Sequence, residues 1–73
     1  FNIGLNDKIA FIKHLFNDKS EDYDRVLSQL NTSISLDEAK LFLDNLVKPD
    51  YNNWAGKEEF EDRFMEIIES KFI

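Results

Sequence analysis

The chain has 73 residues, a formal net charge of −6, 42% hydrophobic and 33% charged residues, and no cysteine. This length leaves room for one small hydrophobic core, and the hydrophobic fraction favours a folded domain over a disordered segment. The absence of cysteine excludes disulfide bonds and thiolate chemistry, and the negative charge disfavours binding to nucleic acid or to anionic lipid.

The N-terminal half of the chain predicts an extended arm followed by two amphipathic helices. Residues 1–5 alternate apolar with polar or small residues, and we expect them to lie along a groove. The first helix is expected over Asp7–Phe16 with Asn6 as its N-cap. A polar break at residues 17–19 separates it from a second helix over Glu21–Leu30, capped by Ser20. The residues predicted to face inward are Leu5, Ile9, Ile12, Leu15 and Phe16 on the first helix, and Tyr23, Val26, Leu27 and Leu30 on the second.

The segment Ser35–Pro49 carries the clearest helix signals. Ser35 is a predicted N-cap, and Glu38 three residues later completes a capping box. Ile34 is expected to pack inward as a hydrophobic staple, and Pro49 prevents the helix from continuing. The predicted core-facing residues of this helix are Leu36, Ala39, Leu43, Leu46 and Val47.

A longer connection, Lys48–Gly56, leads to the last predicted helix, Lys57–Lys71. Tyr51 and Trp54 in the connection are expected to fold back onto the helices, and Phe60, Phe64, Ile67 and Ile68 are expected to face inward. These elements predict an all-α fold, a small four-helix bundle of up-and-down style with an extended N-terminal arm. We expect a single domain over residues 1–73. Because the chain starts with Phe1 rather than Met, we expect it to be part of a longer protein.

None of the candidate catalytic, metal or phosphate sites has the residue types and spacing that its chemistry requires. His14, the only histidine, is expected to be solvated near the C-terminal end of the first helix, and no nucleophile with an orienting partner is recognisable beside it. A carboxylate-bridged di-metal site needs Glu-x-x-His pairs, and an EF-hand needs a glycine at the sixth loop position; the chain has neither. Two glycines are too few for a phosphate-cradling loop. We predict no catalytic residue, metal, cofactor or small-molecule substrate.

Apolar residues outside the predicted core stripes remain as candidates for binding a partner. Phe11, Leu41 and Met65 fall off these stripes on a helical wheel. Together with Tyr51 and Trp54 they are the predicted partner-binding residues, because apolar patches rimmed by charge commonly bind other proteins. Two alternatives stay open: a small bundle can bury each helix on two sides, and single exposed apolar residues can have no role.

A resemblance to a known family covers nearly the whole chain. Four segments carry it, with KPDY, NW and GKEE as the most specific parts: LNDKIAFIKHLF (5–16), EDYDRVLSQLN (21–31), VKPDYNNW (47–54) and GKEEFEDRFMEIIESKF (56–72). Together they resemble a small helical module found at the C-termini of Bacteroidota proteins of unassigned function. The resemblance implies a cytoplasmic, adaptor-like module at the C-terminal end of a longer chain, and it assigns no activity to any residue.

The functional expectation is therefore a non-enzymatic domain that binds another protein or a second copy of itself. A structural end-cap of a longer chain is the alternative. A nucleic-acid-associated adaptor is a further one, and it would require the lysine and arginine side chains to converge in space. No membrane association is expected.

Overall fold

The computed structural model describes residues 2–72, and every regular element in this range is helical. The elements in chain order are α1 (Leu5–Leu15), α2 (Ser20–Asn31), α3 (Leu36–Phe42), the π-helical turn η1 (Leu43–Val47), the 3₁₀ segment η2 (Lys48–Trp54) and α4 (Glu58–Ser70). The predicted all-α class is confirmed. None of the helices in the described range is long and apolar enough to cross a lipid bilayer.

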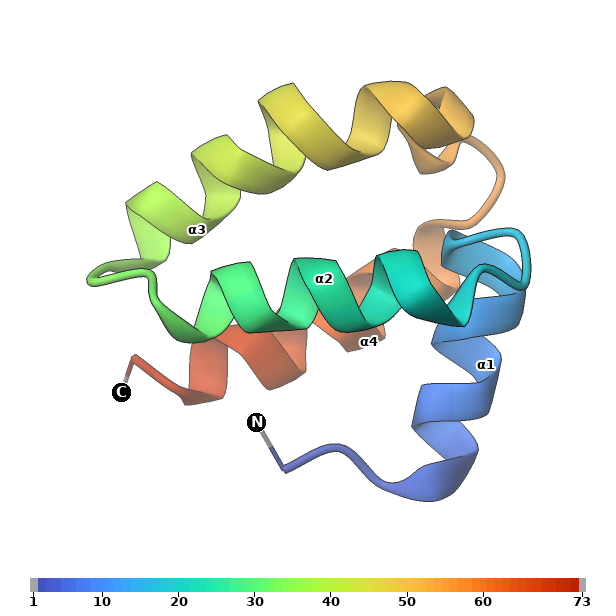
Figure 1. The fold of residues 1–73 in the computed structure, drawn as a ribbon, viewed down its shortest axis with the longest axis horizontal. Coiled ribbons are helices and arrows are strands. Elements are labelled where there is room, and N and C mark those ends of the chain that lie inside the picture. The colour runs from blue at the N-terminus through green and yellow to red at the C-terminus, as the bar shows by residue number, and fades with distance from the viewer. Residues whose placement is uncertain (1, 73) are drawn as a thin grey trace.

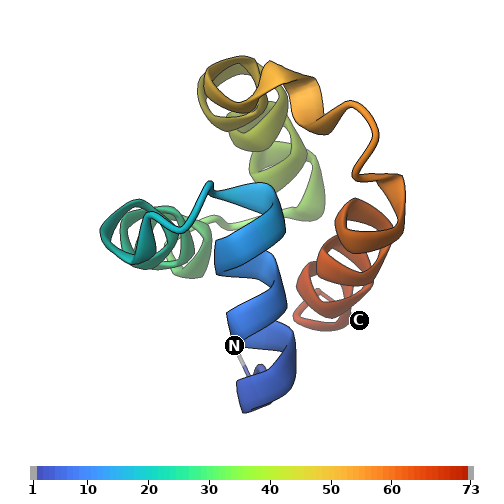
Figure 2. The same ribbon diagram turned by 90° about the vertical axis from the view of Figure 1, so that its right-hand side faces the viewer.

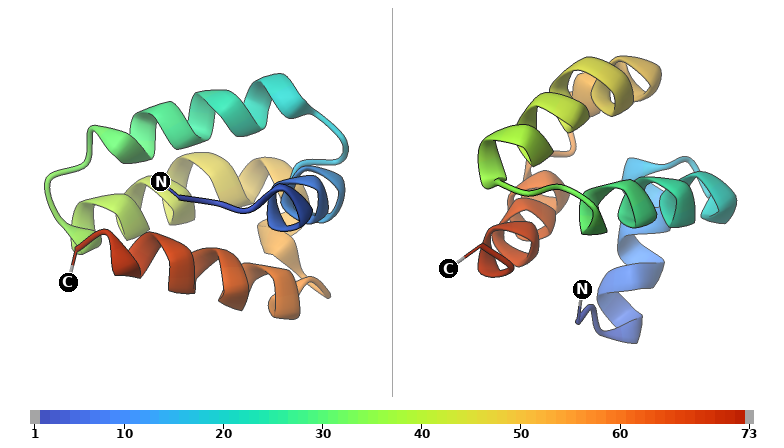
Figure 3. Two further views of the ribbon diagram at one scale, coloured as in Figure 1. Left: turned by 90° about the horizontal axis from the view of Figure 1, so that it is seen from below. Right: turned by 60° about the vertical axis from the view of Figure 1, so that its left-hand side comes forward.

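Three of the helical elements run side by side and alternate in direction. Figure 1 shows α2, then α3 with η1, then α4, each returning along the previous one, as the predicted up-and-down arrangement requires. Helix α1 crosses these three steeply, and they are seen nearly end-on in the view where α1 stands upright (Figure 2). The view from below shows the same arrangement, with α1 almost end-on (Figure 3).

The change of direction between α1 and α2 comes from a short left-handed turn. Asn17 and Asp18 have φ of 53° and 64°, a region that these two residue types tolerate better than most. The backbone N–H of Asp18 donates to the carbonyl of Ile12 at 2.9 Å, and that of Lys19 donates to Phe16 at 2.9 Å. The predicted polar break is therefore a defined turn that sends α2 across α1.

A single hydrophobic core lies between the helices. Its fully buried members are Phe11, Leu15, Phe16, Tyr23, Val26, Leu30, Ala39, Leu43, Val47, Trp54, Phe64 and Ile68. Phe16 is at the centre of this core, since its ring makes edge-on contacts with the rings of Tyr23, Tyr51, Trp54 and Phe64. Edge-to-face arrangements of this kind add to the stabilisation from burial alone.

Helix α1 differs from its prediction in both its start and its buried face. It begins at Leu5, with Gly4 as an N-cap that makes no side-chain hydrogen bond, so Asn6 lies within the helix and the predicted cap is wrong. Phe11, predicted to lie off the core, is 1% exposed, whereas Leu5 and Ile9, predicted inside, are 72% and 55% exposed. The reason is the packing against α4, where the rings of Phe11 and Phe64 meet edge to face at 5.1 Å.

Helices α2 and α4 match their predicted faces. Tyr23, Val26 and Leu30 are buried on α2, and Phe64 and Ile68 are buried on α4. The other predicted inward residues of these two helices, Leu27, Phe60 and Ile67, are partly buried against the core. Ser20 is the first residue of α2 rather than its cap, which is Lys19.

Helix α3 confirms the predicted N-cap and corrects two other expectations. The backbone N–H of Glu38 donates to the Ser35 hydroxyl at 3.1 Å. Ile34 is 86% exposed and forms no inward staple, and Leu46 is 62% exposed rather than part of the core. Leu46 turns outward because η1 is wider than an α-helical turn, which leaves Leu43 and Val47 as the buried pair.

Pro49 does not stop the helical path as predicted, because the path continues from η1 into the 3₁₀ segment η2 and becomes non-helical only from Tyr51. Pro49 lies in the first turn of η2, where its missing N–H removes no hydrogen bond. The predicted N-terminal arm is non-helical over residues 2–4, with Ile3 partly buried against the core, and its Phe1 lies outside the described residues.

Candidate functional site

The structure separates the five predicted partner-binding residues instead of bringing them together. Phe11 and Trp54 belong to the buried core, so their expected position at a surface is wrong. Tyr51 and Met65 are partly buried against the same core. Leu41 is the one member of the five with most of its side chain exposed, at 63%, and its role in binding stays a prediction.

Trp54 is held inside by an unusual backbone turn and by one hydrogen bond. Asn52, Asn53 and Trp54 have consecutive φ values of 55°, 54° and 55°. This left-handed turn forms the last residues of η2 and places the indole in the core, where Nε1 donates to the carbonyl of Leu15 at 2.9 Å. The indole N–H, the polar part of a buried tryptophan, is thereby satisfied. Trp54 therefore joins η2 to the end of α1.

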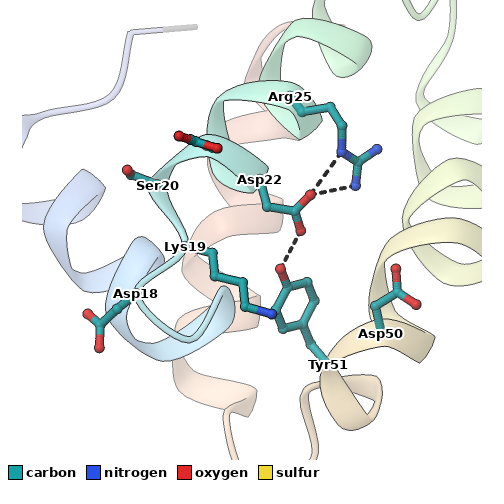
Figure 4. A pocket seen from close by; sticks show the side chains of 8 residues that line it. Asp18, Lys19, Ser20, Asp22, Arg25, Asp50 and Tyr51 are labelled. Carbon is teal, nitrogen blue, oxygen red and sulfur yellow. Dashed lines mark hydrogen bonds and ion pairs between the residues drawn. The ribbon is translucent and has the colours of Figure 1, made fainter.

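A hydrogen bond from Tyr51 connects η2 to the start of α2. The Tyr51 hydroxyl donates a short hydrogen bond to Oδ2 of Asp22, and Arg25 Nε donates to Oδ1 of Asp22 at 2.8 Å (Figure 4). The bond from Tyr51 lowers the pKa of Asp22 below its ordinary value. Burial, followed by the bond to Asp22, raises the pKa of Tyr51 to about 12. The phenol of Tyr51 therefore keeps its proton at neutral pH and remains a hydrogen-bond donor. This Tyr51–Asp22 clamp holds η2 against α2.

An open groove surrounds this clamp, and its lining carries charges of both signs. Carboxylates and cations from the α1–α2 turn, the first turns of α2, and η2 line it: Asp18, Glu21, Asp22, Asp50, Lys19 and Arg25. Figure 4 shows Asp18 and Asp50 on either side of the Tyr51–Asp22 pair. Lys19 Nζ lies 5.9 Å from the centre of the Tyr51 ring. The Tyr51–Asp22 hydrogen bond joins η2 to α2, and the Arg25–Asp22 contact lies within α2. Both are contacts within the fold.

A second groove between α3–η1 and α4 is bridged by Lys48. Its Nζ donates to Oε2 of Glu61 at 2.6 Å and lies 3.8 Å from Oδ1 of Asp44. The hydrogen bond to Glu61 raises the pKa of Lys48. Lys40 and Asp44 line the same groove.

His14 is packed rather than solvated, which corrects its prediction. Its ring stacks on the ring of Phe60 with 4.0 Å between centroids and 13° between planes. The side chain is half-buried at the contact between α1 and α4. Within residues 2–72, no three His, Asp or Glu side chains are grouped so as to hold a metal ion.

One exposed apolar surface, here the α1 face, consists of Leu5 and Ile9 with Lys8 and Lys13. Leu5 and Ile9 are one helical turn apart and point to the same side of α1. Lys8 and Lys13 are exposed and follow Leu5 and Ile9 by three and four residues. Asp7, the only acidic residue of α1, is engaged elsewhere, with Oδ2 3.1 Å from Nη2 of Arg63 on α4. The α1 face is therefore apolar and basic.

Two further exposed leucines, Leu41 of α3 and Leu46 of η1, lie on the α3–η1 rod, and with Asp37 and Glu38 they are here called the α3 face. All four residues are exposed. Asp37 and Glu38 precede Leu41 by four and three residues, so they lie beside it one turn earlier on the helix. Lys40 and Asp44 line the groove against α4, and the two charges one turn before Leu41 are both negative. The α3 face is apolar and acidic.

The sequence predicts an exposed position for one of the four apolar residues on these two faces, Leu41. It predicts core positions for Leu5, Ile9 and Leu46, which are exposed in the structure. A sequence signal for α1 does exist, because its apolar residues form two stripes, Leu5–Ile9 and Phe11–Leu15. Only the packing partner decides which stripe faces inward.

The chain belongs to a family described as Domain of unknown function (DUF8457), whose sequence model matches residues 2–73. No curated protein and no solved structure matches the chain significantly. The family description assigns no activity to any residue of the two faces.

Proposed function

We propose that this domain is a non-enzymatic protein-interaction module that binds through its exposed apolar faces. The observation that carries the proposal is the exposure of Leu5 and Ile9, at 72% and 55%, on a helix whose other apolar stripe already fills the core. In the part of the chain that the structure describes, every buried side-chain N or O atom has a hydrogen-bond partner. The buried polar side chains of this range therefore need no further hydrogen-bond partner. The exposed Leu5–Ile9 stripe is available to contact another protein.

The exposed apolar residues of the two faces favour binding to a partner. Burying a fully exposed leucine or isoleucine side chain is worth about 1.5–3 kcal/mol. Leu5, Ile9, Leu41 and Leu46 are 72%, 55%, 63% and 62% exposed, so each contributes somewhat more than half of that value when a partner covers it.

The family resemblance supports the same proposal in its finer points. The resemblance of the sequence to a C-terminal module of Bacteroidota proteins implies a position at the end of a longer chain and a location in the cytoplasm, and we include both in the proposal. A net charge of −6 speaks against the alternative of a nucleic-acid-associated adaptor.

The test is site-specific photo-crosslinking in the cells that produce the full-length protein. The photoreactive residue p-benzoylphenylalanine replaces Ile9 or Leu41, and in a matched control it replaces Ser28, which is exposed on α2 away from both faces. We expect adducts of defined mass from Ile9 and Leu41 and none from Ser28. Equal labelling at all three positions, or labelling at none, would contradict the proposal.

A further inference from the structure

The structure carries one inference about which partner covers these faces, and it rests on the proposed function. We infer that the partner is a second copy of this chain, with the α1 face of one copy packed on the α3 face of the next. The argument depends on charge, on the separation of the two faces and on the fact that the faces differ.

The charges beside the two apolar pairs are opposite in sign. Lys8 and Lys13 border Leu5 and Ile9, and the acid of α1, Asp7, is turned to Arg63 of its own chain. Asp37 and Glu38 border Leu41, while Lys40 lines the groove between α3 and α4. Two copies placed face to face in this way bury leucine against leucine or isoleucine and pair lysine with carboxylate. Such complementarity selects the right partner and disfavours like-charged ones.

The two faces cannot meet within one molecule. The N-terminal half of α1 extends away from α3, and α2 lies between them along the vertical direction of Figures 1 and 2. A contact between the α1 face and the α3 face therefore joins two molecules.

A second copy explains both faces, whereas an unrelated protein would cover only one. A basic amphipathic helix would suit the α3 face but would be repelled by the lysines of the α1 face. Because the two faces differ, the contact is of the head-to-tail kind, in which a pair of copies keeps one free α1 face and one free α3 face. Such contacts form rings when the rotation closes and open chains when it does not.

The experiment uses two variants that each damage one face. Ile9→Glu adds an acid to the α1 face, and Leu41→Lys adds a base to the α3 face; both positions are more than half exposed, at 55% and 63%. Ser28→Glu is the matched control for Ile9→Glu, with the same added negative charge on an exposed position of α2. Sedimentation velocity over a concentration series measures self-association, and circular dichroism checks that each variant is as helical as the parent.

We expect the parent chain and Ser28→Glu to associate as concentration rises, and each face variant alone to bind itself at least tenfold more weakly. A one-to-one mixture of Ile9→Glu and Leu41→Lys should regain association, because the first keeps an intact α3 face and the second keeps an intact α1 face. If a face variant loses helicity, the neutral variants Ile9→Gln and Leu41→Gln replace the pair.

Two results would overturn the inference. A parent chain that stays monomeric at millimolar concentration rules out a second copy as the partner, while crosslinks from Ile9 to a different protein would leave the proposed function standing. A parent chain that associates but whose two variants do not rescue each other shows a contact of like faces. A lack of any crosslink contradicts the proposed function itself.

Discussion

Replacing Phe11 with alanine should cost about 3–5 kcal/mol of folding free energy, the range for losing a phenylalanine side chain from a core. Phe11 is 1% exposed, and its ring meets that of Phe64 edge to face at 5.1 Å. A domain of 73 residues has a total stability of roughly 4–11 kcal/mol at the usual stability per residue. The substitution should therefore remove a large part of the stability and leave a marginal fold.

The matched control is Ile9→Ala, two residues earlier on the same helix. More than half of the Ile9 side chain is exposed, and alanine is the better helix former, so the free energy of unfolding should change by less than about 0.5 kcal/mol. Urea denaturation at low protein concentration, followed by circular dichroism, measures both variants. A costly Ile9→Ala beside a harmless Phe11→Ala would refute the orientation of α1 and, with it, the α1 face.

Three further predictions concern single hydrogen bonds. Trp54→Phe leaves the carbonyl of Leu15 without its donor and should lower the unfolding free energy in urea by at least about 1–3 kcal/mol; an unchanged midpoint would mean that the bond does not form. Ser35→Ala should cost about 1 kcal/mol through the lost cap, seen by calorimetry as a melting temperature lower by roughly 4–8 °C, and an unaltered temperature would place the start of α3 elsewhere. The pKa of Tyr51 rises on folding from 10.0 to about 12, so its stabilising effect is fully present below pH 10 and is lost as the pH rises toward 12. Tyr51→Phe should therefore lose less stability between pH 9 and pH 11 than the parent chain. The remaining loss is due to Tyr23, whose pKa burial raises, and to Lys48, whose pKa the bond to Glu61 raises; equal losses in urea would contradict the clamp.

The elements that were predicted correctly are those with local causes. The cap at Ser35 depends on a residue three positions away, and the inward faces of α2 and α4 follow from one apolar stripe on each helix. A left-handed turn at residues 17–18 is likewise consistent with a break made of asparagine and aspartate. In each case the interactions lie within one or two turns of helix, which sequence reasoning can evaluate.

The errors arose where distant packing decides between local options. Helix α1 has two apolar stripes, and Phe64, which lies 53 positions after Phe11, selects the one that is buried. Leu46 turned outward because η1 adds width to one turn, a change with no recognised sequence signal. Both errors concern the candidate site, since they moved Leu5, Ile9 and Leu46 from the predicted core to the surface.

The hydrogen bond between Trp54 and Leu15 has a consequence for the rate of folding. The two residues are 39 positions apart, and closing a flexible loop of that length costs about 3 kcal/mol by the logarithmic rule for loop entropy. The individual helices can form on a submicrosecond timescale, but this closure must be completed before the indole gains its buried contacts. The domain should therefore fold more slowly than a helical hairpin of equal length, and the fluorescence of its single tryptophan should report that closing step in a refolding experiment.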